Sequence, residues 1–410
     1  MTSALGAHFF RHEYGRLVAS LSRRVGVHHL ELVEDAVQAA LLTAVECWSR
    51  AELPENPPAW LYRVAGNHLL GELRRRARRA ALLDASAGGE QDPITLPEEA
   101  SLCGEVPDSL LRMLFVCCDP AIAPESQLVL ALKTLCGFDI PEIAQRLFTS
   151  EASVYKRLAR ARKRLREARV APEDSSTQQL LERLPAVQAI LYTLFTEGYL
   201  SHGEAAIRRE LCDEALRLTA LLAAHPAGAR PETFALLALM HLHTARFSAR
   251  QDGSGGLLLL EEQDRSRFDQ QQLACGLTWL ARSAGGTVFS RYHCEAGIAA
   301  EHCLAPSFAE TRWERIVECY ELLDRVAPSA IHTLNRAIAV AELRGAREGL
   351  AVLEAFAPPA WLAGSFVWSA VLADLYRRCG HSEHAQRHRQ AALALAPTAA
   401  VRAALQRRLG

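Results

Sequence analysis

The chain has 410 residues, a formal charge of −1, and 50% hydrophobic but only 7% aromatic residues. The length suits two or three domains, abundant Ala, Leu and Arg favour helices, and a charge near zero excludes a polycation that binds nucleic acid along its whole length. The eleven cysteines form no Cys-x-x-Cys pair, the first residues lack the order of a signal peptide, and no apolar run reaches roughly 18 residues. We therefore expect an all-α protein of the cytoplasm, with no membrane contact.

Two polar stretches without helical periodicity divide the chain. These predicted linkers are 85–106 and 170–179, and they leave three helical pieces at 1–84, 107–169 and 180–410. Any contact with nucleic acid must then come from a local basic patch in one of the pieces.

The first piece carries two helical patterns. Residues 30–50 place apolar side chains at 33, 37, 41, 44, 45 and 48, a stripe that leaves Glu34, Asp35 and Gln38 off the core face. Asn56, followed by two prolines, predicts the cap of a second helix over 59–79, which ends in a cluster of arginines. One helix is therefore acidic or polar on its open face, and the other is strongly basic.

The second piece has the pattern of a helix-turn-helix. Asp139 and Glu142 are spaced as a capping box around Pro141, which begins a short helix, and Ser150 is placed to cap the helix that follows a tight turn. In that second helix the core face is predicted to be Val154, Leu158, Ala161 and Leu165.

The remaining faces of this helix are basic. A solvated helix usually interleaves acids with its bases, but no acid occurs between Glu151 and Glu167. The second helix of such a motif enters the major groove with its N-terminal part. We therefore predict that this helix reads duplex DNA, with Arg164 on phosphate and with base-proximal contacts from Ser150, Ser153, Lys156, Arg157 and Arg160.

The third piece is repeat-like in its last hundred residues. Gly345 and Gly380 lie 35 positions apart, close to a tetratricopeptide period, whereas 180–300 does not follow that period. Such helical repeats commonly bind proteins, so we expect an interaction or regulatory role.

Two groups of polar residues in this piece resemble sites. His293, Cys294, His302 and Cys303 fall on one predicted helix, where ligands nine apart lie about 13 Å apart along the axis, so we expect a packed helix and no metal. Glu197, Asp264 and Arg265 have no nucleophile or phosphate loop nearby, so we expect neither an enzyme nor a cofactor. We predict instead that they form a polar junction that holds this piece to the preceding ones.

Three segments in order resemble the bacterial RNA polymerase sigma factors of the extracytoplasmic-function class, over residues 8–169. They are VEDAVQAALLTAVECW (33–48), NPPAWLYRVAGNHLLGELRRRARR (56–79) and SVYKRLARARKRLR (153–166). Four later segments resemble the subgroup with a long tetratricopeptide-like C-terminal extension: 189–203, 236–250, 257–270 and 334–356.

The resemblance implies core RNA polymerase and promoter DNA as partners. It places a polymerase-binding surface at Glu34, Asp35, Gln38 and Leu42. It also implies that the helix at 59–79 holds the minus-ten element as a single strand, with bases stacked on aromatic rings and phosphates on arginines, through Trp60, Tyr62, Arg63, Asn67, Arg74, Arg75 and Arg78. The helix-turn-helix would read the minus-thirty-five element.

Three positions depart from the family pattern. Ala39 stands where an acid is usual, Leu41 where an aromatic is common, and Gly71 where an Asp often follows Asn67. The first two predict a weaker or shifted polymerase contact, and the glycine weakens its helix by about 1 kcal/mol relative to alanine.

Two alternatives stay open. A one-component helix-turn-helix regulator with a helical-repeat sensing domain would bind its site without polymerase, but it has no need of the aromatic and arginine-rich helix. A helical enzyme would need a nucleophile or cofactor cluster. For the C-terminal extension we expect a protein or small-molecule partner.

Overall fold

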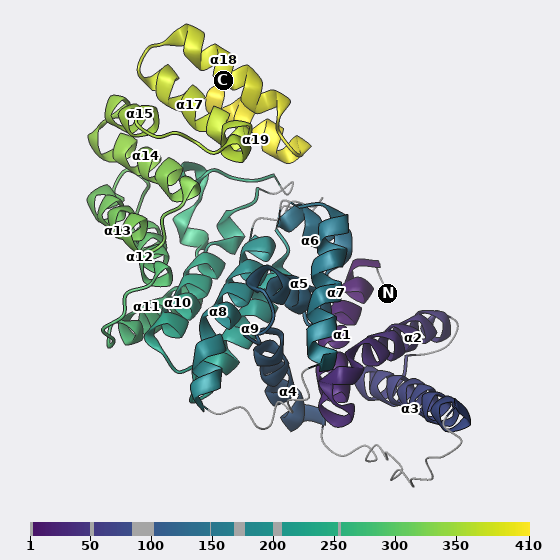
Figure 1. Ribbon diagram of the computed structural model, residues 1–410. Coiled ribbons are helices and arrows are strands. Elements are labelled where there is room, and N and C mark those ends of the chain that lie inside the picture. Colours follow the sequence, from purple (N-terminus) through teal and green to yellow (C-terminus); the bar gives the residue numbers. More distant parts are fainter. Residues whose placement is uncertain are drawn as a thin grey trace. The chain divides into compact units, whose positions relative to one another are not determined.

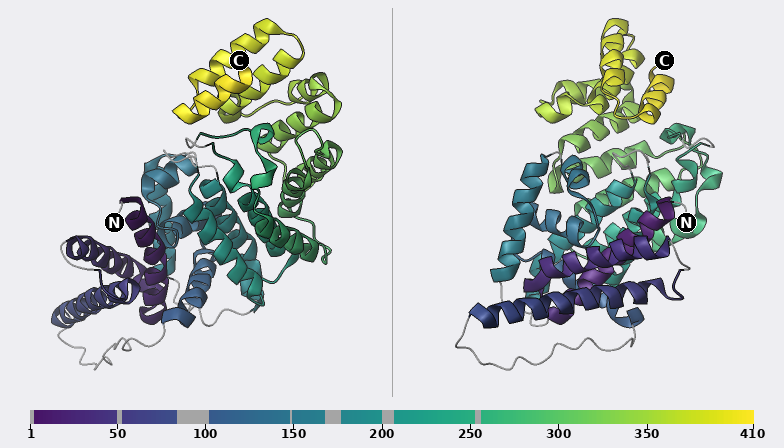
Figure 2. Two further views of the ribbon diagram at one scale, coloured as in Figure 1. Left: turned by 180° about the vertical axis from the view of Figure 1, so that it is seen from behind. Right: turned by 90° about the vertical axis from the view of Figure 1, so that its right-hand side faces the viewer.

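The computed structural model describes residues 3–49, 53–83, 102–147, 149–167, 177–199, 207–252 and 256–410 (Figures 1 and 2). These ranges are built from helices and contain no β-strand, only a bridge between Gln251 and Leu257. The all-α expectation is confirmed. The chain forms two compact units, residues 1–194 and 195–410. No helix in the described ranges is both long and apolar enough to cross a membrane.

The first unit contains seven α-helices and the start of an eighth within the described ranges. They are α1 (Ser3–Val25), α2 (Leu30–Trp48), α3 (Pro57–Leu83), α4 (Leu102–Cys117), α5 (Pro124–Thr134), α6 (Ile140–Arg146), α7 (Glu151–Glu167) and α8 (Thr177–Tyr199), with a short 3-10 turn, η1 (Val27–His29), before α2.

Both predicted linkers extend too far. Residues 84–101 and 168–176 lie outside the described residues, but α4 already begins at Leu102 and α8 at Thr177. The first error arose because Gly104 and Pro107 are typical of linkers, yet both are part of α4.

In the first unit α1 packs against α4, and α4 packs against α5. Gly15 of α1 lies so close to Leu135, the residue that follows α5, that a Cβ atom added at Gly15 would be 2.1 Å from the carbonyl oxygen of Leu135. At the other side of the unit, α2 and α3 pair, and Trp48 of α2 packs on Trp60 of α3 with ring centroids 5.4 Å apart. Phe10 of α1 stacks on Trp48 in turn. One continuous packing therefore joins α1–α3 to α4 and α5.

The start of α8 belongs to the first unit. Arg183 is buried and donates to the Asp119 carboxylate at 2.6 Å and to the carbonyl oxygen of Phe115 at 3.2 Å. The division between the units thus falls inside α8, later than the position 180 that we predicted.

The second unit continues from α8 through a further series of helices. They are α9 (Arg209–Ala224), α10 (Pro231–Ala245), α11 (Gln270–Ser283), α12 (Arg291–Leu304), α13 (Trp313–Val326), α14 (Ala330–Arg344), α15 (Ala346–Glu354), α16 (Ala360–Ala363), α17 (Phe366–Arg378), α18 (Ser382–Ala394) and α19 (Ala399–Leu409). The described residues between α10 and α11 include three short 3-10 turns, η3 (Phe247–Ala249), η4 (Leu260–Glu262) and η5 (Arg265–Arg267). We call residues 256–269, which include η4 and η5, the strap.

The repeat-like part of the sequence forms helical hairpins. Gly345 has φ 98° at the turn from α14 to α15, and Gly380 has φ 80° just before α18. Glycine adopts this left-handed region without a steric penalty, which explains its place at both turns. The 35-residue spacing of the two glycines therefore marks equivalent turns of two successive hairpins.

Candidate nucleic-acid and protein interface

The helix-turn-helix forms as the sequence predicts. Asp139 accepts a hydrogen bond from the Glu142 backbone at 2.7 Å, and the Glu142 side chain accepts one from the Asp139 backbone at 2.9 Å, which completes the capping box of α6. Ser150 caps α7 by accepting from the Ser153 backbone at 3.2 Å. These caps satisfy amides that would otherwise lack partners, and so they fix where both helices begin.

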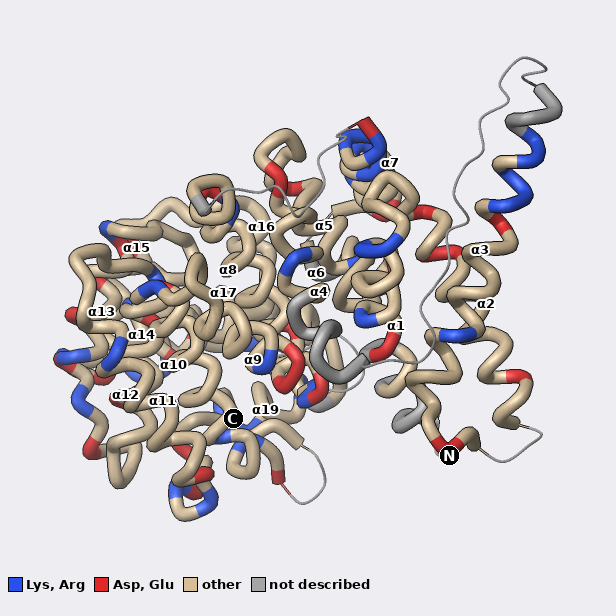
Figure 3. The backbone as a smooth tube through the Cα atoms, turned by 90° about the horizontal axis from the view of Figure 1, so that it is seen from below, with Lys and Arg blue, Asp and Glu red and all other residues tan. Residues whose placement is uncertain are grey.

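The two kinds of face on α7 are clearly separated. Val154, Leu158, Ala161 and Leu165 are buried, as predicted. Lys156 and Arg160 are exposed and form no ion pair within the described chain. Figure 3 shows Lys and Arg gathered along α7 and again on the outer part of α3. Helix α7 therefore presents cations that are free to meet an external anion.

The other predicted DNA-contacting residues of α7 differ in exposure. Arg157 and Ser153 are half-buried, and Ser150 is exposed. Arg164 donates to the carbonyl oxygen of Ala121 at 3.2 Å, so part of its hydrogen-bonding capacity is used inside the unit. The sequence reasoning did not single out Tyr155, although it is 59% exposed. A bulky side chain beside Lys156 in the first half of the helix was the available signal.

The basic part of α3 is exposed as well. Asn56 caps the helix by accepting from the Ala59 backbone at 3.1 Å, as predicted. Five of the predicted DNA-contacting side chains are exposed along it: Arg63, Asn67, Arg74, Arg75 and Arg78. Glu72 pairs with Arg75 at 2.9 Å and with Arg76 at 3.4 Å. One acid therefore offsets part of this positive charge.

The two aromatic residues of α3 are partly covered. Trp60 is half-buried in the cluster with Trp48, and Tyr62 is half-buried with the Arg24 guanidinium 5.7 Å from its ring centroid. In this arrangement Trp60 helps to hold α3 against α2. The structure therefore gives this tryptophan a packing role that the sequence did not predict.

The open face of α2 combines polar and apolar side chains. Asp35 and Gln38 are exposed, as predicted, and Leu42 is 67% exposed. Val45 was assigned to the core stripe but is 53% exposed. Residues 35, 38, 42 and 45 recur at three- or four-residue steps, so they share one face of the helix. We call these four residues the α2 surface.

Glu34 does not belong to this exposed face, and the prediction that it lies off the core face is wrong. Its side chain is only 2% exposed. The carboxylate accepts hydrogen bonds from Thr134 of α5 at 3.0 Å and from Arg162 of α7. The partners come from helices far along the chain, which a helical pattern within α2 does not reveal.

Burial and a neighbouring arginine have opposite effects on the pKa of Glu34. Burial raises the pKa of the Glu34 carboxyl, and the positive charge of Arg162 opposes that shift. Tyr14 of α1 also contacts Glu34, and burial together with the Glu34 charge raises the pKa of its phenol. Next to this site, Arg166 of α7 pairs with the exposed Glu31 at 2.6 Å. Two arginines of α7 thus bind the start of α2.

Two residues of the predicted polar junction make contacts inside the second unit. Glu197 is buried and lies 4.0 Å from Arg208, which precedes α9. Asp264 caps η5 by accepting from the Ser266 backbone at 3.0 Å and from its hydroxyl at 2.7 Å. A polar junction of this kind needs an arginine beside one of the two acids. Glu197 has Arg208 in that place, whereas Asp264 forms no ion pair among the described residues and binds Ser266 instead.

The histidines and cysteines of α12 are engaged in packing. His293 accepts from the Ser290 backbone at 3.1 Å at the start of the helix. Cys303, near its end, lies 3.4 Å from the carbonyl oxygen of Leu242 in α10. Across the described parts of the chain, no group of three or more His, Cys, Asp or Glu side chains is arranged to hold a metal ion.

Comparison with known proteins gives three family matches. Residues 10–79 match Sigma-70 region 2, residues 121–165 match Sigma-70, region 4, and residues 183–284 match a family of unknown function (DUF6596). An uncharacterized protein of Rhizobium meliloti (strain 1021) is 33% identical over 387 residues, which cover 93% of this chain and 90% of that protein. No solved structure matches the chain. The first two matches contain the α2 surface and the basic faces of α3 and α7.

Proposed function

Since this chain belongs to the sigma-70 family, as a sigma factor of the extracytoplasmic-function type with a C-terminal extension, we propose that it directs core RNA polymerase to promoters and opens the start region. The observation that carries the proposal is the free cationic face of α7, which lies in the residues matched to region 4.

Helix α7 is proposed to read the minus-thirty-five element as duplex. Lys156 and Arg160 are exposed and form no ion pair with any residue that the structure describes, and each can meet a phosphate or a base edge in the major groove. Ser150, Ser153 and Arg157 lie at the same end of the helix and complete the proposed contact. Arg164, farther along, is proposed to reach the DNA backbone.

Helix α3 is proposed to hold the minus-ten element after its strands separate. The exposed Arg63, Arg74 and Arg78 can neutralise phosphates, and Asn67 offers a hydrogen-bonding group on the same helix. A base extruded onto Tyr62 or Trp60 would offset the few kcal/mol that unpairing costs. Because Trp60 packs on Trp48, a base can stack only on the part of the Trp60 ring that Trp48 does not cover.

The α2 surface is proposed to bind core polymerase. Leu42 and Val45 are 67% and 53% exposed, so they present apolar area at the surface, and Asp35 and Gln38 add polar groups beside it. Burial of such side chains is a main source of binding free energy at protein interfaces. Glu34 is excluded from this surface as long as Thr134 and Arg162 cover it.

Promoter binding requires the first unit to open. The two promoter elements are about 25 base pairs apart, or about 85 Å at about 3.4 Å per pair. Helices α2 and α7 cannot stay bonded through Glu34 and Arg162 while their domains occupy sites that far apart. We therefore propose that the packed first unit is the free form and that polymerase and DNA stabilise an open one.

The extension is proposed to regulate this activity in cis or through a partner. The segments around Glu197, Asp264 and Arg265 are proposed to link it to the sigma domains. Replacing Asp264 with Ala is then expected to lower transcription. Unchanged transcription together with unchanged stability would exclude this role for Asp264.

Reconstituted transcription tests the main proposal. Purified full-length chain and core polymerase are given fragmented genomic DNA, and the 5′ ends of the RNA are sequenced. We expect start sites that share two motifs about 25 base pairs apart, and a loss of these starts with the Leu42→Asp or the Lys156→Ala/Arg160→Ala variant. A regulator that acts without polymerase would bind duplex DNA but give no new start sites.

A further inference from the structure

The second unit contains a cavity of about 480 Å³. This volume lies within the range of about 300–1,000 Å³ that is usual for small-molecule sites. Its walls come from the strap and from α12, α13, α14, α17 and α19, and the side chains that line them are mostly apolar. Four of them are aromatic: Phe308, Trp313, Tyr320 and Phe366. The cavity can therefore hold a small apolar molecule and pack aromatic rings against it.

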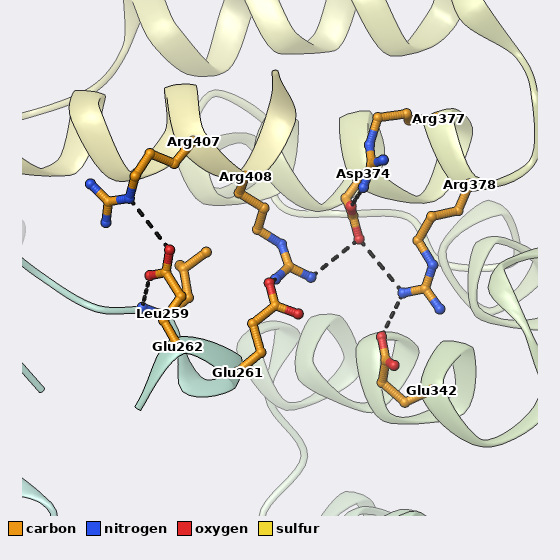
Figure 4. Close-up of polar contacts among 9 residues, drawn as sticks. All are labelled: Leu259, Glu261, Glu262, Glu342, Asp374, Arg377, Arg378, Arg407 and Arg408. Atoms are coloured by element: carbon orange, nitrogen blue, oxygen red, sulfur yellow. Dashed lines mark hydrogen bonds and ion pairs between the residues drawn. The ribbon is translucent and has the colours of Figure 1, made fainter. Parts of the chain in front are cut away.

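The strap forms one wall of the cavity and is bound to α19. Leu260 of the strap lines the cavity. Arg408 of α19 pairs with Glu261 of the strap at 2.7 Å, across 147 positions of the chain (Figure 4). Arg407 pairs with Glu262 at 3.4 Å beside it. The cavity is therefore a product of the tertiary fold, because segments far apart in the sequence share its wall.

The charged side chains that line the cavity already neutralise one another. Among the described lining residues they are three acids and two arginines: Glu261, Glu342, Asp374, Arg378 and Arg408. Arg408 lies 3.3 Å from Asp374 as well as 2.7 Å from Glu261. Arg378 pairs with Glu342 at 2.5 Å and approaches Asp374 at 3.6 Å. Arg377, outside the lining, pairs with Asp374 at 2.7 Å and balances the third acid. An ionic ligand would therefore find no unpaired counter-charge in this wall.

The other two titratable side chains among the described lining residues are uncharged near pH 7. Burial, together with the charges of Arg246 and Arg265, lowers the pKa of His302 to about 3. Burial raises the pKa of the Tyr320 phenol. Neither side chain offers a full charge to a ligand, so the lining as a whole favours a neutral one.

Asn335 of α14 adds a neutral hydrogen-bonding group to the lining. Its side chain is half-buried and lines the cavity. The amide forms a hydrogen bond with Tyr320, and the described chain provides it with no other side-chain hydrogen bond. Because an amide has two N–H donors and an oxygen with two lone pairs, most of its capacity remains for a ligand.

We propose that this cavity binds a neutral, mostly apolar molecule that has an aromatic ring system and one hydroxyl group. The ring system lies among the aromatic walls, and the hydroxyl reaches the Asn335 amide. An ion would lose its hydration there without gaining a free counter-charge, which is unfavourable. The binding requires neither polymerase nor promoter DNA, so its test is separate from that of the proposed transcription activity.

Calorimetry with three naphthalene derivatives tests the preference for a neutral ligand. The probes 2-naphthol, 2-naphthoate and 2-naphthylmethylammonium are titrated separately into the purified full-length protein at about pH 7, where only the first is neutral. We expect 2-naphthol to bind at least about tenfold more tightly than either ion, because neither ion finds a free counter-charge. An ion that binds as tightly as 2-naphthol, or no binding of 2-naphthol, would overturn the proposal.

The Asn335→Leu variant tests the hydrogen bond. The probe 2-methylnaphthalene has the same ring system as 2-naphthol but no hydroxyl, so the ratio of the two affinities reports on the hydroxyl alone. We expect the ratio of the 2-naphthol affinity to the 2-methylnaphthalene affinity to fall by about two- to tenfold in the variant. An unchanged ratio would overturn the assignment of the hydroxyl to Asn335.

Two tryptophan variants on α14 locate the ligand. Ile338 is half-buried and lines the cavity, so Ile338→Trp fills it and is expected to weaken 2-naphthol binding about tenfold or more. Leu343→Trp adds the same side chain outside the lining, at a position that is 36% exposed, and is expected to keep the wild-type affinity. Circular dichroism verifies folding, and Val371→Trp on α17 fills the same cavity if Ile338→Trp does not fold. Wild-type affinity in a folded cavity-filling variant would place the ligand elsewhere and overturn the proposal.

Discussion

Arg162 of α7 donates a hydrogen bond to the carboxylate of Glu34 in α2, 128 positions away in the chain. The acid is almost fully buried, and Thr134 of α5 binds its other oxygen at 3.0 Å. The contact therefore joins the helix that carries the proposed polymerase surface to the helix that carries the proposed duplex-reading face. As long as it persists, the two regions stay together.

Replacing Arg162 with Ala is expected to loosen this packing. Removing one partner leaves the Glu34 carboxylate buried without a cation, and this usually costs about 3–5 kcal/mol. Hydrogen exchange of the α2 and α7 amides measures the loss. Arg166→Ala is the matched control, because its pair with Glu31 is exposed and such pairs contribute less than about 1 kcal/mol.

The double variant Glu34→Met/Arg162→Met distinguishes charge from packing. Both charged groups are then replaced by apolar ones, so we expect most of the lost protection to return. Equal protection of α2 in wild type and Arg162→Ala would contradict the role given to this pair.

Local features of the first unit were predictable from sequence because their causes lie within a few residues. The capping box of Asp139 and Glu142 and the Ser150 cap depend on neighbours three positions away. The buried face of α7 follows from helical spacing alone. These interactions specify each helix before any tertiary contact forms.

The predictions that were wrong or incomplete concern residues whose partners lie far away in the sequence. Glu34 is buried by Arg162 and Thr134, and no pattern inside α2 encodes that neighbour relationship. Trp60 packs on Trp48 because α2 and α3 pair, a relationship that the separate helical patterns leave undetermined. In the second unit, Arg408 likewise donates to Glu261 at 2.7 Å across 147 positions of the chain.

Gly15→Ala is expected to destabilise the first unit. The added Cβ would lie 2.1 Å from the Leu135 carbonyl oxygen, so α1 and the end of α5 that Leu135 caps must move apart. Overpacking of this kind usually costs about 1–3 kcal/mol. Thermal unfolding of the full-length protein, with the transition of the first unit followed by hydrogen exchange, measures the effect. An unchanged transition would show that the two helices can separate without cost.

Gly71→Ala is expected to have the opposite effect. Gly71 lies inside α3 and a Cβ there would meet nothing within 4 Å, so alanine gains helix propensity without a clash. The expected stabilisation of α3 is about 0.5–1 kcal/mol. Slower hydrogen exchange of the α3 amides would verify the stabilisation. Faster exchange would contradict it and would mean that the added methyl group meets another part of the protein.

Lys156→Ala is expected to reduce the salt dependence of promoter binding. If the exposed ammonium neutralises one phosphate, its loss lowers the slope of log affinity against log salt by about 0.9. Fluorescence anisotropy of a duplex promoter fragment with the assembled holoenzyme, at several salt concentrations, gives this slope. Glu151→Gln, on the same helix but without a positive charge to lose, is not expected to lower it. A slope unaltered by Lys156→Ala would remove this side chain from the DNA interface.

The extension is expected to lose stability as pH falls below about 6.5. Burial and the charges of Arg246 and Arg265 lower the pKa of His302 to about 3, so the folded state binds this proton less readily than the unfolded state does. The stabilisation is complete above the unfolded value of 6.5 and is lost progressively between 6.5 and about 3, at about 1 kcal/mol per pH unit just below pH 6.

Urea unfolding between pH 6.5 and 5.5 measures this slope, in a range where most carboxylates stay ionised. His302→Phe keeps an aromatic ring beside Trp313 but removes the titrating group, so its slope should be smaller by about that amount. Equal slopes in the two proteins would mean that His302 takes up its proton without unfolding its surroundings.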